Sequence, residues 1–516
     1  MTVALSLGSL RRQFPRTAAA FAQLPDGGDA ALWHLLHLDL SYAQPREVRS
    51  MDAIRGGGEL LGDFDVVLAG GGLSLLYAAL LSARGLRVAV FDRRQIGCGH
   101  REWNISRREL APLGASGLFS AAEVERLILM QYQTGICRFS GGPSYAVSGV
   151  LDCVVDAETL LHALRDRCVR QGVTLLPYRA LSGYTHEADR LLVQVCSTEG
   201  PLRTQVLRTR LLLDGLGAVS PHARFDLCCP TVGGVMDDLT LGSGPHELDP
   251  KVGEILVTTD GVEEQRQHIW EGFPTVSATG DAVSTRRMTI YLFYYLRSDL
   301  LAQHGPLPLL NLYERYFATL SRYKRGPLTL VRPTYGYIPA YTRLRPMPSA
   351  PSDRVLLVGD AAGRHSPLTF CGFGAMIRSF LSIGEGVVRL LHDDRLDAES
   401  LSALWQEPPA LKVLGGLTLM MSPPLFADGS EDPETVNELL NAAFATLHGM
   451  GEDTYRRFLQ DDVDGPTFVR FMLGAAERHP QVYRKVLRYL SLSESVTWLF
   501  RLAQLHLERR STEPSV

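Results

Sequence analysis

The sequence lacks the features of a metal-binding, secreted or membrane-spanning protein. Its eight cysteines form no C-x-x-C pair, which argues against zinc, iron–sulfur clusters and a disulfide framework and indicates a reducing compartment. No run of about 18 apolar residues is present, so no segment is expected to cross a membrane as a helix. A net charge of −4 and a hydrophobic share of 45% describe a soluble globular enzyme and exclude a nucleic-acid binder.

The N-terminus contains no acidic residue before Asp26, although Arg11, Arg12 and Arg16 precede it. The stretch Thr17–Leu24 is too short and too weakly apolar to be the core of a signal peptide. We therefore expect a cytoplasmic bacterial protein whose first ~30 residues are disordered or loosely docked. Targeting to an organelle such as a plastid is the alternative.

The most informative segment that is present runs from Val355 to Arg378. A short apolar run ends in Gly359-Asp360, and Gly372-Phe373-Gly374 opens an apolar, helix-like stretch. A strand that delivers one carboxylate to a ribityl chain, followed by a helix N-terminus, suits a flavin, because free N–H groups and the helix dipole stabilise an anionic ring edge. Taken alone, the segment fits any strand–turn–helix.

A glycine loop far upstream makes the flavin interpretation specific. The buried-strand pattern Asp63–Ala69 leads into Gly70-Gly71-Gly72, an apolar helix pattern follows, and a second strand ends in Asp92. This order places a pyrophosphate on a helix N-terminus and a carboxylate on the adenosine ribose. Only the first two glycines of G-x-G-x-x-G fit, since Leu75 holds the third position. The alternative is a βαβ unit that binds no nucleotide.

The two nucleotide segments enclose a long insert, and a chain of 516 residues is expected to hold more than one domain. Gly253–Thr258, Gln267–Phe273 and Arg287–Leu296 alternate like antiparallel strands. The predicted fold class is α/β with an α+β insert: a split Rossmann-like FAD-binding domain, an antiparallel β-rich substrate domain and a C-terminal helical region. The predicted segments are a helical lead-in (1–60), the first part of the FAD-binding domain (61–224), the mainly β-rich substrate domain (225–350), the resumed FAD-binding domain (351–393) and the helical region (394–516).

Three longer motifs go beyond any general flavin pattern. They are REWNISRREL (Arg101–Leu110), WEGFP (Trp270–Pro274) and SPLTFCGFG (Ser366–Gly374). Together they resemble the CruA/CruP class of lycopene cyclases and cyclase-like flavoproteins, which have the fold of glutathione-reductase-type FAD proteins. Weaker similarity extends the resemblance, in patches, from about Asp65 to Asp461. Ser74, His365 and Cys371 are positions where this chain departs from the class, which tends to carry Gly, Gln and a small residue there.

The resemblance implies lycopene cyclisation in carotenoid biosynthesis, with reduced FAD taking part without net electron transfer. A proton adds to a terminal alkene, the tertiary cation is attacked by a neighbouring double bond, and a proton leaves. A carboxyl kept neutral in an apolar pocket suits the first step. Glu271, between Trp270 and Phe273, is the first candidate for that acid, against a role as a structural strand carboxylate. His365 is the second, against a role as a turn histidine bonded to backbone.

The candidate cofactor residues share a place in the glycine loops or the resembling motifs. We expect non-covalent FAD, with NAD(P)H as an external reductant and no metal. Asp360 is the strongest candidate, for a ribityl hydroxyl, and Arg101 is a flavin contact or a surface arginine. Glu102 and Asn104 are expected to hold their loop in shape, and Trp103 to be core. The predicted FAD contacts are Gly70, Gly71, Gly72, Asp92, Arg93, Arg101, Gly359, Asp360, Pro367, Gly372, Phe373 and Gly374.

An apolar polyene substrate implies contact with a membrane surface. Val413–Met421 and the helix around Val482–Leu507 are candidates for that contact, against internal helix packing. Thr289, Tyr291, Phe293 and Tyr295 share one strand face and line either a polyene tunnel or a sheet core. Two other functions stay open: a flavin redox enzyme, such as a monooxygenase or an isoprenoid ene-reductase, and a non-catalytic flavin-binding protective protein.

Overall fold

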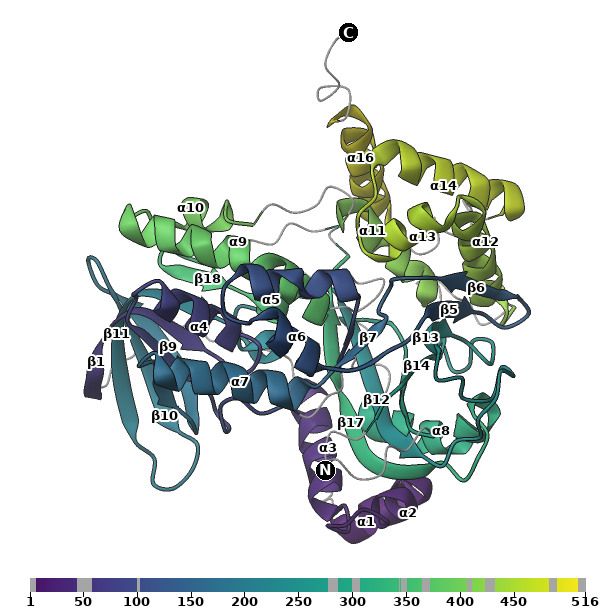
Figure 1. Ribbon diagram of the computed structural model, residues 1–516, viewed down its shortest axis with the longest axis horizontal. Helices are drawn as coiled ribbons and strands as arrows, with labels where there is room; N and C mark the ends of the chain where they lie inside the picture. The colour runs from purple at the N-terminus through teal and green to yellow at the C-terminus, as the bar shows by residue number, and fades with distance from the viewer. Residues whose placement is uncertain are drawn as a thin grey trace.

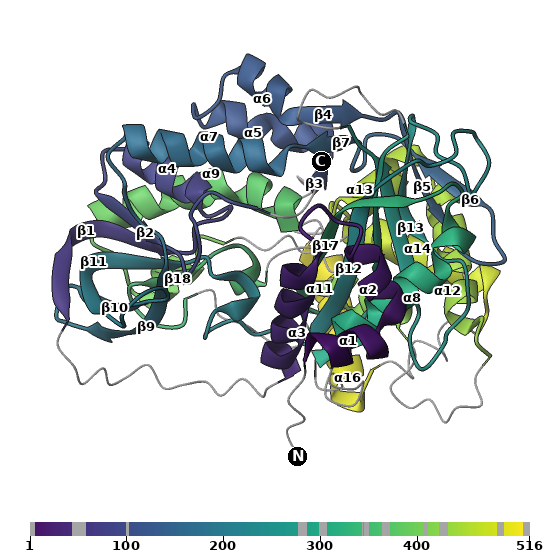
Figure 2. The same ribbon diagram turned by 90° about the horizontal axis from the view of Figure 1, so that it is seen from below.

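In the computed structural model two large β-sheets lie side by side, each covered by helices (Figures 1 and 2). One sheet is built mainly from parallel strands and the other mainly from antiparallel strands. The residues that the structure describes are 6–43, 58–99, 103–276, 286–298, 307–342, 344, 350–363, 372–405, 411–422, 432–481 and 490–508.

The first sheet has seven strands within the described residues, in the order β8-β2-β1-β11-β10-β9, with β18 also on β11. Strands β8, β2, β1, β11 and β18 run parallel, whereas β9 and β10 form an antiparallel meander with β11. Because β18 comes after the whole second sheet in the chain, this domain is split as expected. The strands are β1 (Glu59–Ala69), β2 (Val88–Phe91), β8 (Thr174–Leu176), β9 (Arg179–His186), β10 (Leu191–Ser197), β11 (Thr204–Asp214) and β18 (Val355–Leu357).

Helices α4 (Leu75–Ala83), α7 (Ala157–Arg170) and α9 (Gly372–His392) cover one face of this sheet (Figure 2). Helix α4 is apolar on nearly every side, because it lies between the sheet and the other two helices. Short elements connect these layers: η1 (Arg107–Leu110), α5 (Ala111–Ala115), α6 (Ala121–Leu127), η2 (Gly217–Val219), η4 (Gly359–Ala362) and α10 (Ala398–Ser402).

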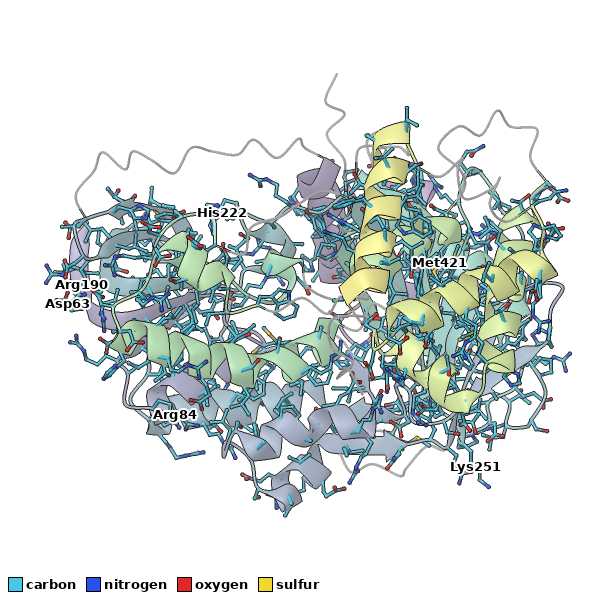
Figure 3. All side chains as sticks on the ribbon, turned by 90° about the horizontal axis from the view of Figure 1, so that it is seen from above. Asp63, Arg84, Arg190, His222, Lys251 and Met421 are labelled. Carbon is cyan, nitrogen blue, oxygen red and sulfur yellow. The ribbon has the colours of Figure 1, made fainter. Side chains whose placement is uncertain are left out.

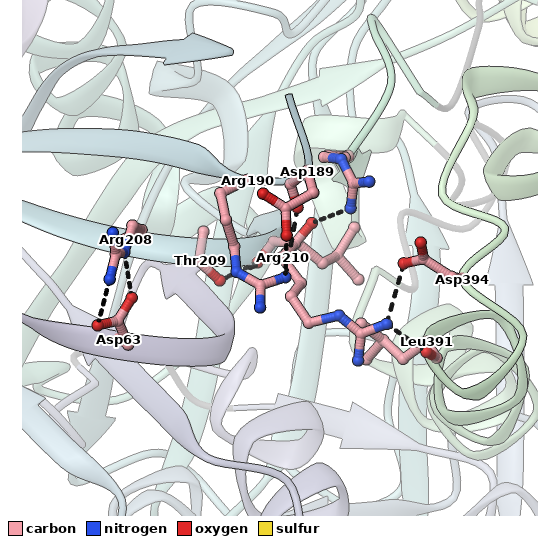
Figure 4. A network of polar contacts seen from close by, with 10 residues as sticks. Asp63, Asp189, Arg190, Arg208, Thr209, Arg210, Leu391 and Asp394 are labelled. Carbon is pink, nitrogen blue, oxygen red and sulfur yellow. Dashed lines mark hydrogen bonds and ion pairs between the residues drawn. The ribbon is translucent and has the colours of Figure 1, made fainter. Parts of the chain in front are cut away.

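A polar network joins the two parts of the split domain (Figure 4). Arg210 on β11 donates to the carbonyl of Leu391 at the end of α9 (2.5 Å) and pairs with Asp394 (3.0 Å). At the C-terminal end of a helix, a guanidinium donates to a carbonyl that has no partner within the helix. Its positive charge also interacts favourably with the negative end of the helix dipole. Arg208 on the same strand pairs with Asp63 on β1. Side chains of β11 therefore tie the resumed part to the first part.

The second sheet has eight strands within the described residues, in the order β16-β12-β15-β14-β13-β5-β6, with β17 also on β12. Its first two strands in the chain, β5 and β6, correct the sequence assignment, which placed 61–224 wholly in the FAD-binding domain. β5 pairs in parallel with β13. Cys137 on β5 and Tyr145 on β6 belong to the hydrophobic core of this sheet. The strands are β5 (Thr134–Arg138), β6 (Ser144–Val147), β12 (Leu227–Asp237), β13 (Val252–Val257), β14 (Ile269–Pro274), β15 (Met288–Phe293), β16 (Leu296–Arg297) and β17 (Thr329–Ala340).

The two faces of the second sheet pack against different partners. Trp270, Ile290 and Leu292 belong to the core under α8 (Pro308–Tyr323) and the N-terminal helices. Tyr291 and Phe293, one residue out of phase, belong to the opposite core. A small third sheet, β3 (Trp103–Ile105), β7 (Cys153–Val155) and β4 (Ile128–Gln131), completes the described strands.

The N-terminal helices α1 (Leu7–Gln13), α2 (Pro15–Phe21) and α3 (Asp29–Ala43) pack tightly on α8, so the expectation of a disordered or loosely docked N-terminus is wrong for residues 6–43. Phe14 and Phe21 are buried, and Phe21 meets Tyr313 edge to face at 5.2 Å. The stretch Thr17–Leu24 is too short and too weakly apolar for a signal peptide. Its apolar residues instead contribute to an internal face of these helices.

Two carboxylates cap helix N-termini across this contact, one from α8 and one from the N-terminal helices. Glu314 on α8 accepts hydrogen bonds from the backbone N–H groups of Arg16 and Thr17 in the first turn of α2. Asp39 on α3 accepts from the N–H groups of Leu309 and Leu310 in the first turn of α8. Each carboxylate satisfies orphan donors and favours the positive end of a helix dipole.

The C-terminal helices cover the second sheet on the side of Tyr291 and Phe293. Val413–Met421 was a candidate for membrane contact or for internal helix packing, and its described apolar side chains are buried in that core. Met421 lies among these helices in Figure 3. Across the part of the chain that the structure describes, no helix has the length and apolar character needed to cross a membrane. The helices are α11 (Leu411–Leu417), η5 (Thr418–Met421), α12 (Thr435–Gly449), α13 (Glu452–Leu459), α14 (Gly465–Arg478) and α16 (Leu492–Glu508).

Candidate functional site

A cavity of about 320 Å³ lies where the two sheets face each other. Backbone of the glycine-rich turns forms one side, and aromatic side chains of the second sheet form the other. Its lining residues are Leu73, Ser74, Trp103, Asn104, Gly215, Gly217, Thr231, Glu271, Tyr291, Phe293, Tyr335, Gly336, Ile338, Val358, Gly359, Asp360, Gly372, Phe373 and Met376.

The loop Gly70-Gly71-Gly72 turns from β1 into α4 at one end of the cavity. Gly70 has a φ of +106°, and a Cβ there would lie 2.6 Å from the carbonyl oxygen of Gly215, so only glycine fits without displacement. A Cβ on Gly72 would meet nothing within 4 Å. Gly70 is therefore needed by the fold, whereas Gly72 leaves an open surface on which a pyrophosphate can lie.

Asp92 at the end of β2 shapes the same loop. Its carboxylate accepts hydrogen bonds from the backbone N–H groups of Gly71 (2.7 Å) and Arg94 (2.8 Å). Asp92 thus stands beside the glycine loop, where the sequence order placed the ribose carboxylate. Arg93 follows it and is exposed, and neither residue lines the cavity.

A second glycine turn meets this loop from β11. Asp214 is buried and accepts hydrogen bonds from the hydroxyl of Ser220 (2.5 Å) and the N–H of Leu216 (3.0 Å). Burial raises the pKa of Asp214. Gly215 and Gly217, which follow it, line the cavity. This second turn therefore lies beside the first glycine loop.

The segment that resumes the first domain supplies the next wall. Gly359 and Asp360 follow β18 and line the cavity, as do Gly372 and Phe373 at the first positions of α9. Gly374 is buried one residue further on and does not line it. A helix N-terminus, a carboxylate and two glycines therefore converge on one space, although they come from segments whose proximity the sequence alone could not show.

Glu271 on β14 faces into this cavity from the second sheet. One of its carboxyl oxygens, Oε1, accepts a hydrogen bond from the Asn104 side-chain amide at 2.8 Å. Burial raises the pKa of Glu271 to about 7, and the hydrogen bond from Asn104 opposes that rise. A carboxyl of this kind holds a proton near neutral pH and can give it to a group bound in the cavity.

Two residues of the REWNISRREL motif have roles that the sequence did not reveal. Trp103, expected in the core, lines the cavity and stacks on Phe373 with ring centroids 4.8 Å apart. Asn104, expected to hold a loop, contacts Glu271. Their presence in an unusual motif was the available signal, but the motif could not say which residues face a shared space.

Other predicted site residues divide into two groups. Tyr291 and Phe293 line the cavity, whereas Thr289 and Tyr295 do not. Arg101, His365 and Pro367, together with Glu102 and Cys371, lie outside the described residues.

The residues present fit FAD. The open side of Gly72 suits a pyrophosphate, Asp360 and the start of α9 suit a ribityl chain and an anionic ring edge, and stacked aromatic rings suit a flat ring system. The cavity is walled on its far side by aromatic and aliphatic groups, with Glu271 as its one carboxyl from the second sheet among the described lining residues.

Solved structures share this arrangement. A geranylgeranyl bacteriochlorophyll reductase-like protein from Thermoplasma acidophilum superposes with a TM-score of 0.52 at 14% identity, over 84% of this chain and 100% of that one. The halogenase PltM, solved with phloroglucinol and FAD, gives 0.54 at 14% identity, over 87% and 93%. The p-nitrophenol 4-monooxygenase PnpA from Pseudomonas putida DLL-E4 gives 0.52 at 14% identity, over 80% and 98%.

The chain has the fold of the FAD-dependent flavoproteins. The predicted fold class is thereby confirmed. Neither the protein-family models nor the curated protein sequences gave a match. Identities this low establish the fold alone, so the chemistry of this flavoprotein fold has to be argued from the cavity.

Proposed function

We propose that the chain is an FAD-dependent enzyme of carotenoid biosynthesis that cyclises the ends of a linear C40 polyene such as lycopene. The observation that carries the proposal is Glu271, a carboxyl with a raised pKa set into an otherwise apolar wall opposite the flavin-type glycine turns. The resemblance of WEGFP and REWNISRREL to lycopene cyclases supports the choice of substrate. Bound FAD in its reduced form supplies a negative charge beside the substrate.

Glu271 supplies the proton that starts the reaction. Its O–H bond breaks as a new C–H bond forms on the terminal alkene, leaving a tertiary cation on the polyene and a carboxylate on the protein. A neighbouring double bond then attacks the cation and closes the ring, and the ring cation gives one proton back to the Glu271 carboxylate, which restores the neutral acid and a neutral product. The atoms balance without net oxidation, so the product is an isomer of the substrate.

The side chains that line the cavity can stabilise the short-lived cation on the polyene. Trp103, Phe373 and Tyr291 present aromatic rings, whose negative faces attract positive charge at short range. The same rings exclude water, which would otherwise capture the cation as an alcohol.

Expression in a bacterium that accumulates lycopene tests the proposal. We expect cyclic carotenes with the mass of lycopene, and their loss in Glu271→Gln while the purified variant keeps its bound flavin. The Gln side chain can still accept from Asn104, so the change removes the proton and little else. Unchanged cyclisation by Glu271→Gln would remove this residue as the acid.

A second candidate is an isoprenoid ene-reductase that uses NAD(P)H as external reductant. It is favoured by one observation, since reducing an alkene also needs a proton donor such as Glu271, and by the name of the Thermoplasma neighbour. Product mass separates the classes: cyclisation leaves it unchanged, reduction adds two hydrogens for each double bond, and monooxygenation adds one oxygen.

Contact with a membrane surface follows from a polyene substrate, and α16 is our proposed contact. Leu492, Val496, Leu499 and Phe500 share one face of this helix, and each is more than half exposed. Apolar faces of this kind bind at the headgroup boundary of a bilayer. The opposite face is fixed to the protein through Trp498, which donates to the carbonyl of Val413.

Flotation with phosphatidylcholine vesicles tests the contact. We expect the wild-type protein to float with the vesicles and the double variant L499S/F500S to lose at least about fivefold in binding. Leu202→Ser, which changes an exposed leucine in the connection between β10 and β11, is the matched control. Equal flotation of all three proteins would exclude α16 as the contact.

A further inference from the structure

Asn104 occupies a connecting place between the two walls of the cavity. It lies on β3, which pairs with β7 in the small sheet, and its neighbour Trp103 stacks on Phe373 of α9. From this position its amide reaches across to β14 and donates to Glu271 Oε1. Among the described residues, Asn104 is the one that hydrogen-bonds this carboxyl. The first sheet's side of the cavity thus holds the acid that the second sheet carries.

Tyr132 is the neighbour of Asn104 on the protein side. Burial raises the pKa of the Tyr132 hydroxyl, and the Asn104 side chain opposes that rise. Gly253 on β13 makes room for the tyrosine, since a Cβ there would lie 2.3 Å from the ring.

We propose that Asn104 is a positioning residue for Glu271: by holding Oε1 it leaves Oε2 to carry the transferable proton and directs that oxygen at the cavity. This inference rests on the proposed function and deepens it. A carboxyl free to rotate would present its proton to the substrate only part of the time, and proton transfer falls steeply with misplacement.

Asn104 is the main polar group that affects the pKa of Glu271, because the other groups around the carboxyl are neutral. Cys229 on β12, Tyr132 after β4, Tyr295 after β15 and Tyr323 at the end of α8 interact with the carboxyl. Burial raises the pKa of each, so all four are neutral at physiological pH. Because none of these four groups changes charge between pH 5 and 9, they do not shift the titration of Glu271 in that range.

The test compares Asn104→Leu with wild-type holoprotein by two measurements. The first is the pH profile of cyclisation, and the second is the carboxylic-acid C=O band in infrared difference spectra between acid and alkaline solution. Removing an N–H donor from the carboxylate raises its pKa. We expect the midpoint of both curves to rise by about one pH unit, while the low-pH rate falls by at least about tenfold. Glu271→Gln, which lacks the band, identifies the signal.

Gln131→Leu is the matched control. It removes an amide from β4 of the same small sheet, where Gln131 donates to Asp152 at 3.1 Å, outside the cavity. We expect its profile and its band to match those of the wild type. Asn104→Asp serves if the leucine variant does not fold, because a second carboxyl beside Glu271 raises the midpoint still further.

The outcomes separate the two proposals. An unshifted band together with an unchanged rate in Asn104→Leu overturns the positioning role. A shifted band in a protein that makes no cyclic carotene supports the contact with Glu271 and overturns the proposed function. A lower rate with an unshifted midpoint, shared by Gln131→Leu, shows a general structural effect and also overturns the inference.

Discussion

Glu271 is a residue at which the proposed proton transfer and the stability of the fold make opposing demands. Burial raises its pKa to about 7, above the ordinary value of 4.5. The folded protein therefore holds a proton that the unfolded chain releases from about pH 4.5 upward. Its contribution to stability is fully present below that pH and is lost as the pH rises through about 7. At alkaline pH the protein carries a buried charge with one hydrogen-bond donor among the described residues.

Glu271→Gln should accordingly stabilise the holoprotein at alkaline pH. We expect its free energy of unfolding to exceed the wild-type value by roughly 3 kcal/mol at pH 8 and to match it near pH 4.5, because each unit by which the folded and unfolded pKa values differ corresponds to about 1.4 kcal/mol. Denaturant unfolding at the two pH values, at equal flavin saturation, measures the difference. An equal effect at both values would mean that the carboxyl does not change its ionisation in this range.

Sequence reasoning reached Glu271 but missed its partner. A carboxylate between aromatic residues in an unusual motif is visible in the sequence, and the cavity wall confirms its placement. The contact with Asn104 joins residues 167 positions apart, and nothing in either motif encodes that distance. Side-chain pairs across two sheets depend on how the sheets pack, which local periodicity does not determine.

The loop between β1 and α4 shows how one element combines a folding constraint with a binding surface. Gly70 is confined by Gly215, whereas Gly72 faces open space. Alanine at Gly70 would collide with backbone and would need an unfavourable φ. Alanine at Gly72 would collide only with a bound phosphate.

Gly72→Ala should therefore fold normally and lose flavin. We expect at least about tenfold weaker FAD binding, or about 1.4 kcal/mol, with little change in the unfolding midpoint of the flavin-free protein. Gly70→Ala should lose both flavin and stability. Gly114→Ala, in helix α5 with no neighbour closer than 4.0 Å, is the control that should change neither binding nor fold. Normal flavin affinity in Gly72→Ala would place the pyrophosphate elsewhere.

Elements with strong local patterns were predictable, and those that depend on distant partners were not. The strand–glycine–helix unit at Gly70 and its counterpart at Asp360 follow from short-range periodicity and turn residues. Strands β5 and β6 were assigned to the wrong domain because β13, the strand that joins β5 to the second sheet, comes about a hundred residues later. The sequence could not decide between membrane contact and internal packing for Val413–Met421, because apolar residues look alike in a buried helix and an interfacial one.

At the scale of the whole molecule, Arg378 joins three parts of the chain. From α9 it pairs with Glu109 in η1 and lies 3.7 Å from Asp461 of the C-terminal region. Both carboxylates are buried. Helix α9, the REWNISRREL segment and the C-terminal region therefore meet at one guanidinium, which holds the helical region against the flavin-type domain.

Arg378→Met should destabilise the protein by roughly 2–4 kcal/mol, because losing a partner leaves buried carboxylates less compensated. Arg84→Met is the matched control. Arg84 pairs with Glu385 on the same helix, but both side chains are about one third exposed, so its loss should cost no more than ~1 kcal/mol. Thermal unfolding of both variants compares them, and equal losses would show that the buried pair is no stronger than the surface one.

The reciprocal caps between the N-terminal helices and α8 also determine when the N-terminal helices can complete their folding during synthesis. Arg16 leaves the ribosome 298 residues before Glu314, the side chain that caps its helix. At synthesis rates of about 5–20 residues per second, that interval lasts roughly 15–60 seconds. Throughout it the apolar faces of α1 and α2 have no α8 to cover them. Helices α1 and α2 thus reach their final contacts only after α8 has been made, and the nascent chain has to keep their apolar faces from aggregating until then.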